Sequence, residues 1–186
     1  MYCIVLQRRI FLIEKTETAS FRLEKMIVEK LRKEAKEKDV SLNSLVGQIF
    51  SMHVGWHANS HKAGFVPLPK VLMTKTMEKL SQDEIKNIAE YIAEKEVRSM
   101  ILMLGREQNI ASILDSFEFW LKATDFIYKH DNYDESHRFV IVHSMGKNWS
   151  FYLGHVMKLV FEQLGAKTEL EVNPKILVIN VSVGKK

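Results

Sequence analysis

The sequence predicts an α+β protein in which a small helical domain precedes a mixed domain. Within residues 16–57, one short alternating segment is followed by two amphipathic helices. Residues 58–69 contain a Gly and a Pro-x-Pro pattern, which favours a linker. Over 70–186 the apolar spacing changes between helix and strand periods in the order α-α-β-α-β-β. That order is typical of a small α+β domain.

The alternating segment is Thr18–Leu23, and it predicts a strand with two different faces. One face is apolar, and it consists of Ala19, Phe21 and Leu23. The other face is compact and polar, and it consists of Thr18, Ser20 and Arg22. Alternation alone favours an ordinary edge strand with a solvated polar face. A lone strand cannot pair its own backbone groups, however, so a partner strand is required.

Two helices follow the strand. Residues 25–38 contain no Gly or Pro, and apolar residues recur there at Ile27, Leu31 and Ala35. We interpret the charged residues between them as a solvated helix face without a binding role. Ser41 is a predicted N-cap. The second helix carries one apolar stripe, formed by Leu42, Leu45, Val46, Ile49, Phe50 and Trp56.

This order of elements resembles the ribbon-helix-helix DNA-binding domains of the Arc and MetJ type. The matching residues are the strand Thr18–Leu23, the helix around 29–35 and the turn Val40-Ser41-Leu42-Asn43-Ser44-Leu45. The turn is the most specific part. The resemblance covers residues 16–57 and implies an obligate homodimer whose paired strands enter the major groove of double-stranded DNA.

The resemblance also implies roles for individual residues. The outward strand side chains Thr18, Ser20 and Arg22 would contact bases, for which these residue types are suited. Ser41, Leu42 and Asn43 would contact a phosphate, because a helix N-terminus offers free N–H donors. The predicted strand contains few Lys and Arg residues, so it differs from a strongly basic DNA-binding strand.

Charge and cysteine content agree with a nucleic-acid partner. The net charge of the 186-residue chain is +4, and residues 1–62 hold 11 basic against 7 acidic side chains, so the whole excess lies there.

Cys3 is the single cysteine, which excludes an intrachain disulfide and favours a cytoplasmic location. We expect residues 1–15 to form an arm in which Arg8 and Arg9 could touch DNA. No apolar run is long enough for a membrane span.

In the second domain we expect helices over 82–104, 110–128 and 149–164, a strand over 138–143, and a hairpin of 168–172 with 176–183. Ser81 and Glu84 match a capping box at the start of the first of these helices. No catalytic motif or Gly-rich phosphate loop is present, so we predict neither an enzyme nor a cofactor. Ser144 and Ser150 lie near His143 and His155 only in sequence.

Two histidine sets are weak metal candidates. His53, His57 and His61 would share a face if the second helix continued past Gly55. The second set consists of His130, Asp131, Asp134 and His137. For both sets a polar surface is the favoured interpretation.

The segment Met145–Leu153 could hold an anion through Lys147 and a helix N-terminus, walled by Trp149, Phe151 and Tyr152. A tight turn followed by core aromatic residues is the favoured alternative.

We therefore expect a sequence-specific DNA-binding transcription regulator of the repressor type, a homodimer through the strands. The second domain would join dimers into a tetramer or bind a small-molecule or metal effector. Two alternatives stay open: an antitoxin-type interaction protein, and a sensing domain with a DNA-binding head.

Overall fold

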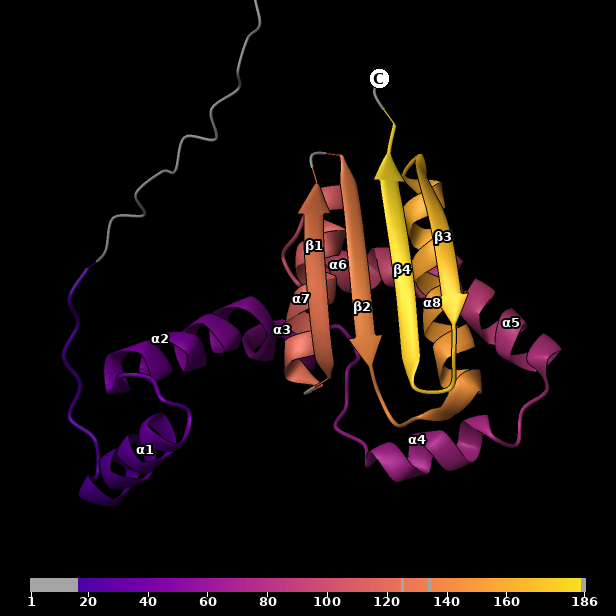
Figure 1. The fold of residues 1–186 in the computed structure, drawn as a ribbon. Helices are drawn as coiled ribbons and strands as arrows, with labels where there is room; N and C mark the ends of the chain where they lie inside the picture. The colour runs from indigo at the N-terminus through magenta and orange to yellow at the C-terminus, as the bar shows by residue number, and fades with distance from the viewer. Residues whose placement is uncertain (1–16, 125, 134, 185–186) are drawn as a thin grey trace, which may run out of the picture. The chain divides into compact units, whose positions relative to one another are not determined.

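The computed structural model describes residues 17–124, 126–133 and 135–184. The chain divides into two compact units, and the division falls after Val46 (Figure 1). The expected α+β class is confirmed at the level of helices with a four-stranded antiparallel sheet. The predicted arm and Cys3, Arg8 and Arg9 lie outside the described residues, as does Asp134.

Unit 1 contains helix α1, Lys25–Glu37, and the start of helix α2, Leu42–Met52. Asp39 adopts φ 52° in the connecting turn, which reverses the chain. The Ser41 hydroxyl accepts the Ser44 N–H at 3.0 Å, so the predicted N-cap is confirmed. In the two helices only Ala35 and Leu45 are buried.

The expected strand Thr18–Leu23 is not formed in the single chain. Residues 17–24 are irregular and exposed. The physical reason is that a lone strand has no hydrogen-bond partners for its backbone. A β-strand exists only with a neighbour that takes its N–H and C=O groups, and a single copy supplies none here. The paired ribbon therefore stays a prediction.

The second helix runs further than expected. It continues through a π-helical turn, η1 (His53–His57), into α3 (Ala58–Ser60), so part of the predicted linker 58–69 is helical. Its end belongs to unit 2, where Trp56, Ala63 and Leu104 form a small apolar cluster. Gly55 allows the Phe119 ring to approach, because a Cβ there would lie 2.3 Å from that ring. This packing explains why the division falls before the predicted linker.

Unit 2 continues with α4 (Lys70–Met77), α5 (Gln82–Tyr91), π-helical η2 (Ile92–Glu96), α6 (Val97–Met103) and α7 (Ile110–Ala123). The predicted capping box of Ser81 and Glu84 is present in full, and Gly105 follows the helix with φ 73°. The helix expected over 110–128 is five residues too long. Its last part belongs to a strand that the sequence analysis missed.

The sheet consists of β1 (Ile127–Tyr133), β2 (Ser136–Val142), β3 (Ala166–Val172) and β4 (Ile176–Val183), in the order β1-β2-β4-β3. The predicted hairpin of β3 and β4 is confirmed. Helix α8, Gly146–Gln163, connects β2 to β3, and β4 lies between those two strands. The chain thus forms a split β-α-β unit.

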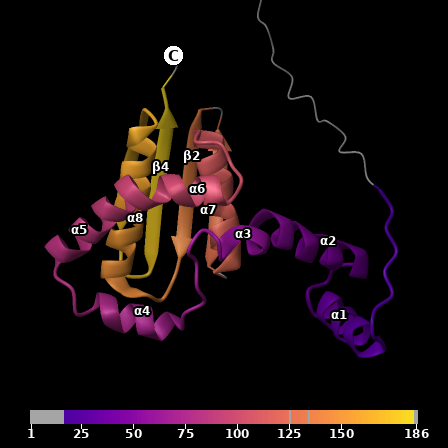
Figure 2. The same ribbon diagram turned by 180° about the vertical axis from the view of Figure 1, so that it is seen from behind.

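Helices cover one face of this sheet. From behind, α5, α6, α7 and α8 lie in front of the strands (Figure 2), and α8 packs on α5, β3 and β4. Phe139 of β2, Phe161 of α8, Ile85 of α5 and Leu121 of α7 have no exposed surface. Burial of such side chains contributes about 1.5–3 kcal/mol each, so unit 2 has a core of its own.

The two helical glycines of the second helix predict opposite effects of added methyl groups. We expect Gly55→Ala to lower the free energy of unfolding by about 1–3 kcal/mol, because the half-buried Phe119 ring must move. Urea unfolding followed by circular dichroism measures this change.

Gly47→Ala is the matched control, since nothing lies within 4 Å of its added Cβ. There the loss of glycine's backbone freedom should stabilise the helix by about 0.5–1 kcal/mol. Equal effects of the two substitutions would contradict the packing of Phe119 on Gly55.

Candidate nucleic-acid interface

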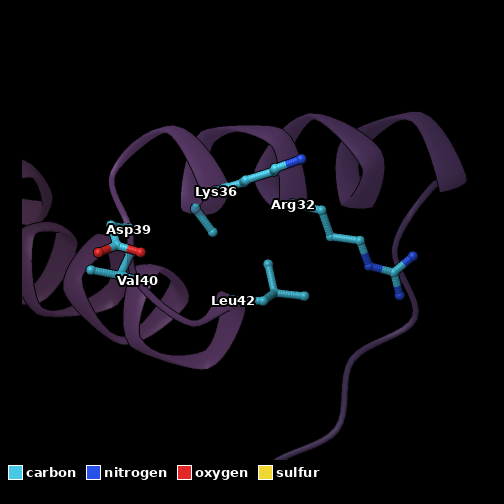
Figure 3. A pocket seen from close by; sticks show the side chains of 6 residues that line it. Arg32, Lys36, Asp39, Val40 and Leu42 are labelled. Atoms are coloured by element: carbon cyan, nitrogen blue, oxygen red, sulfur yellow. The ribbon is translucent and has the colours of Figure 1, made fainter.

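The turn between α1 and α2 borders an open hollow of about 410 Å³. Its lining residues come from both helices and the turn, and they are Arg32, Ala35, Lys36, Asp39, Val40 and Leu42. Figure 3 shows Leu42 pointing from the start of α2 toward α1. The hollow therefore combines an apolar floor with charged groups beside a helix N-terminus.

The Ser41 cap already satisfies one of the free N–H groups at that helix N-terminus. The Ser41 hydroxyl lies 2.8 Å from the Ser44 hydroxyl and accepts the Ser44 N–H. Helix geometry leaves the N–H groups of Leu42 and Asn43 without intrahelical acceptors. An anion here would meet two backbone donors and the positive end of the helix dipole. Of the three predicted phosphate-contacting residues, Leu42 and Asn43 offer donors, whereas Ser41 has a structural role.

Two cations at this hollow were missed by the sequence analysis. Arg32 and Lys36 lie one turn apart on α1 and both line the hollow. The charge pattern of α1 by itself predicts only a solvated helix face. The signal that could have found them is their i, i+4 spacing in the last turns before the loop. There a cation also interacts favourably with the C-terminal end of the helix dipole.

The predicted base-contacting residues Thr18, Ser20 and Arg22 are all exposed. Because residues 17–24 form no strand in the single chain, the structure does not bring these three side chains together on one face. Their arrangement depends on a partner strand.

The first histidine set does not form a metal site. The helix does continue past Gly55, as the prediction required, but it does so as a π-helical turn. A π-turn changes the i, i+4 alignment that would have put His53, His57 and His61 on one face. Within the described ranges, no group of three or more His, Cys, Asp or Glu side chains could hold a metal ion.

The second set is a hydrogen-bonded chain instead. His130 Nδ1 bonds to Glu118 Oε1, and His130 Nε2 lies 3.0 Å from His137 Nδ1. The His130 ring also stacks on Phe139, with ring centroids 4.0 Å apart. Asp131 pairs with Lys129 at 2.8 Å rather than with a histidine. This chain connects α7 to β1 and β2, and it explains how a polar segment forms the edge strand β1.

His143 and Ser150 do meet, although the sequence showed only proximity. The Met145 N–H donates to His143 Nδ1 at 3.2 Å, so the His143 Nε2–H donates to the Ser150 hydroxyl at 2.8 Å. Ser150 in turn donates to the Asn173 carbonyl at 2.6 Å. Both side chains are buried, and the serine proton is directed to a carbonyl. These hydrogen bonds therefore connect the end of β2, α8 and the β3–β4 turn. The Ser150 hydroxyl is not arranged as a nucleophile.

The segment Met145–Leu153 forms no pocket lining of the predicted kind. Trp149 is buried, and Phe151 and Tyr152 pack partly against the main core. The Asn148 amide donates to the Met77 carbonyl at 2.8 Å and accepts from Gln82. These contacts favour the alternative interpretation, a tight turn followed by core aromatic residues.

A second hollow, of about 270 Å³, lies beside the π-helical turn η2. Its floor is apolar and includes Ala93, Ile101 and Val160, while Arg98, Gln108 and Gln163 supply polar groups. The sequence analysis gave no sign of it, because its residues come from α6, α7, α8 and the loop before α7.

In the part of the chain that the structure describes, no helix combines the length and apolar character that crossing a bilayer requires. No protein-family profile matches this chain, and no curated protein matches its sequence. The candidate interface therefore depends on the geometry of the α1–α2 turn and on the sequence resemblance alone.

His143 predicts how stability depends on pH. Burial lowers the pKa of His143, so the unfolded chain, with a pKa of about 6.5, binds the proton more readily. The free energy of unfolding should stay constant above about pH 7 and fall by up to about 1.4 kcal/mol per pH unit as pH decreases through 6.5 toward the folded pKa. Urea titrations between pH 8 and 5 measure this.

His143→Gln is the comparison, because an amide keeps a donor and an acceptor without a proton to gain. Its pH dependence should be flatter than that of the wild type, and the difference isolates His143 from the other histidines. Parallel curves for the two proteins would contradict the assignment.

Proposed function

We propose that this chain is a sequence-specific DNA-binding regulator of transcription in the cytoplasm, and that its residues 17–52 act as half of a homodimer. One observation carries the proposal: α1, α2 and the segment before α1 carry large apolar side chains with much of their surface exposed. These side chains are 41% to 59% exposed, and they include Leu23, Met26, Ile27 and Ile49.

A second copy offers the matching cover. Large exposed apolar groups on one small segment mark an interaction surface. If two copies pair through residues 18–23, each strand gains the backbone partner that it lacks alone. The apolar strand side chains would then pack over the helices, and the polar side chains would face outward. The same step thus satisfies the backbone and covers the apolar surface.

The outward face of such a ribbon fits the DNA major groove. Arg22 would bond to a guanine edge, and Thr18 and Ser20 would contact neighbouring bases. The N–H groups of Leu42 and Asn43 would bind a phosphate, with Arg32 and Lys36 close by. Ser41 would hold the helix start in place through its cap.

Small-molecule sensing by unit 2 is the second candidate function. It is favoured by the 270 Å³ hollow at η2, because π-turns occur frequently at functional sites. In that case the DNA-binding segment would report the occupancy of the hollow. An antitoxin role has no specific observation in its favour.

The first test of the proposed function is DNA binding by Arg22→Ala. We expect it to lose about 1–3 kcal/mol of affinity for a selected site and to relax sequence preference, because a base contact is removed. Competition binding on genomic fragments and on random DNA, across a salt series, measures both effects.

Arg32→Gln is the matched comparison at the phosphate side. It should weaken specific and random DNA about equally and reduce the salt slope by about 1. Equal losses on both DNAs for Arg22→Ala would make Arg22 a phosphate contact. Unchanged binding by both variants would remove the proposal.

The second test addresses the dimer. Ile49→Asp places a charge on the exposed apolar stripe of α2, so the dimer should dissociate and DNA binding should be lost. Gln48→Asp, its exposed neighbour on the same helix, should leave the dimer intact. Sedimentation equilibrium of the full chain measures both, and an Ile49→Asp protein that stays dimeric would contradict the proposed interface.

A further inference from the structure

One face of the sheet is not covered by any described helix of unit 2, and this face carries an apolar patch. All helices seen behind the strands in Figure 1 lie on the opposite face. Antiparallel sheets with one open face normally carry polar side chains there. On this face, however, Ile127 of β1 is 74% exposed, Val142 of β2 is 40% exposed and Ile176 of β4 is 41% exposed.

The strand register makes these side chains contiguous. Ile127 pairs with Val142, and Val142 pairs with Ile176, so the three form one row across the sheet. Two residues further along each strand, Val140 pairs with Val178. Residues two apart on a strand share a face, so the half-buried Val140 and the buried Val178, which is 5% exposed, adjoin the three exposed side chains in one patch over three strands. We call it the outer patch.

Opposite charges flank the outer patch in the same row. Lys129 on edge strand β1 pairs in register with Val140. On the other edge strand, Glu171 of β3 pairs with Val178. From one edge of the sheet to the other, the row therefore consists of the Lys129 cation, Val140, Val178 and the Glu171 carboxylate.

We propose that the outer patch binds the outer patch of a second copy of this chain, face to face, about a two-fold axis parallel to the strands. Such an axis between β2 and β4 would place β1 of one copy over β3 of the other. Val140 would then face Val178, Val142 would face Ile176, and each Lys129 would face a Glu171. Sheets packed in this way lie about 10 Å apart, within reach of lysine and glutamate side chains.

The charge order selects a second copy as the occupant. A two-fold axis creates two equivalent contacts, each between the cationic edge of one sheet and the acidic edge of the other. Binding of an unrelated partner would not require opposite charges on the two edges. The next row carries Asp131 and Glu169, which would be like charges under the same axis. Asp131 is paired with Lys129 at 2.8 Å and Glu169 with Lys167 at 2.7 Å, so Lys129 would lie between Asp131 of its own strand and Glu171 of the second copy. Sheet packing at about 30° separates rows away from the centre.

This inference deepens the proposed function and rests on it for one conclusion only. If α1 and α2 pair two copies, the outer patch pairs two others and the contacts close, the assembly is a tetramer with two ribbons. The face-to-face contact itself needs nothing from the DNA-binding segment.

The test is sedimentation equilibrium of the full chain and of two sheet variants. Val142→Glu should raise the dissociation constant of this contact at least about a hundredfold, because it buries an unpaired charge. Ser136→Glu, on the same face of the same strand but outside the patch, should leave it unchanged. Thermal unfolding checks that both variants stay folded.

A charge exchange tests the two-fold axis itself. Lys129→Glu and Glu171→Lys should each weaken association about tenfold, and the double variant should restore it to within about threefold of the wild type. Restoration supports the predicted facing pair. Two single losses that add in the double variant would overturn it.

Combination with Ile49→Asp separates this inference from the proposed function. If the wild type is a tetramer, each of Val142→Glu and Ile49→Asp should yield dimers, and both together should yield monomers. A wild type that is dimeric and becomes monomeric only with Ile49→Asp would overturn the outer-patch contact and leave the DNA-binding dimer in place. Dissociation only with Val142→Glu would support the patch and remove the ribbon dimer.

Discussion

Two helices and one unpaired segment cannot enclose an apolar core, and the rest of the molecule depends on this constraint. In α1 and α2 only Ala35 and Leu45 are buried. A helix pair of this length is marginal in water unless its apolar face is covered. In the proposed dimer, a second copy would supply that cover to the α1–α2 segment. The same requirement makes the segment before α1 a candidate strand, because one pairing event would cover both.

Unit 2 meets the constraint differently. Its split β-α-β arrangement places α8 and α5 on one face of a four-stranded sheet, where Phe139, Ile141, Leu177 and Ile179 have no exposed surface. Polar groups secure this arrangement at its ends, where His143 and Ser150 connect β2, α8 and the β3–β4 turn. The unit thus folds around its own core and leaves one sheet face open. Helices α1 and α2 bury little apolar surface, whereas in unit 2 only that sheet face is left exposed.

The sequence predicted the elements whose signals are local. The capping box at Ser81, the N-cap Ser41 and the β3–β4 hairpin depend on residues a few positions apart, and all three are present. Strand β1 was missed because its sequence is polar. Its inner side chain His130 is stabilised by Glu118 and Phe139, which are neighbours only after folding. The cations at the α1–α2 turn were missed for a related reason, since a charged helix face is usually solvated and only the turn identifies a binding position.

The charge distribution indicates why assembly would matter for DNA binding. The predicted strand has one cation, Arg22, and the hollow at the start of α2 adds Arg32 and Lys36. Phosphate attraction grows with the number of contacts neutralised, so one such segment would bind DNA weakly at physiological salt. Two ribbons held in one assembly convert the second binding event into an intramolecular one, which raises overall affinity without new contacts. An open sheet face that pairs with its own copy, as we propose, would supply that connection through residues other than those proposed to contact the bases. The sparse basic residues of the predicted strand and the apolar patch of the sheet would then have one explanation, in which affinity comes from the number of bound segments.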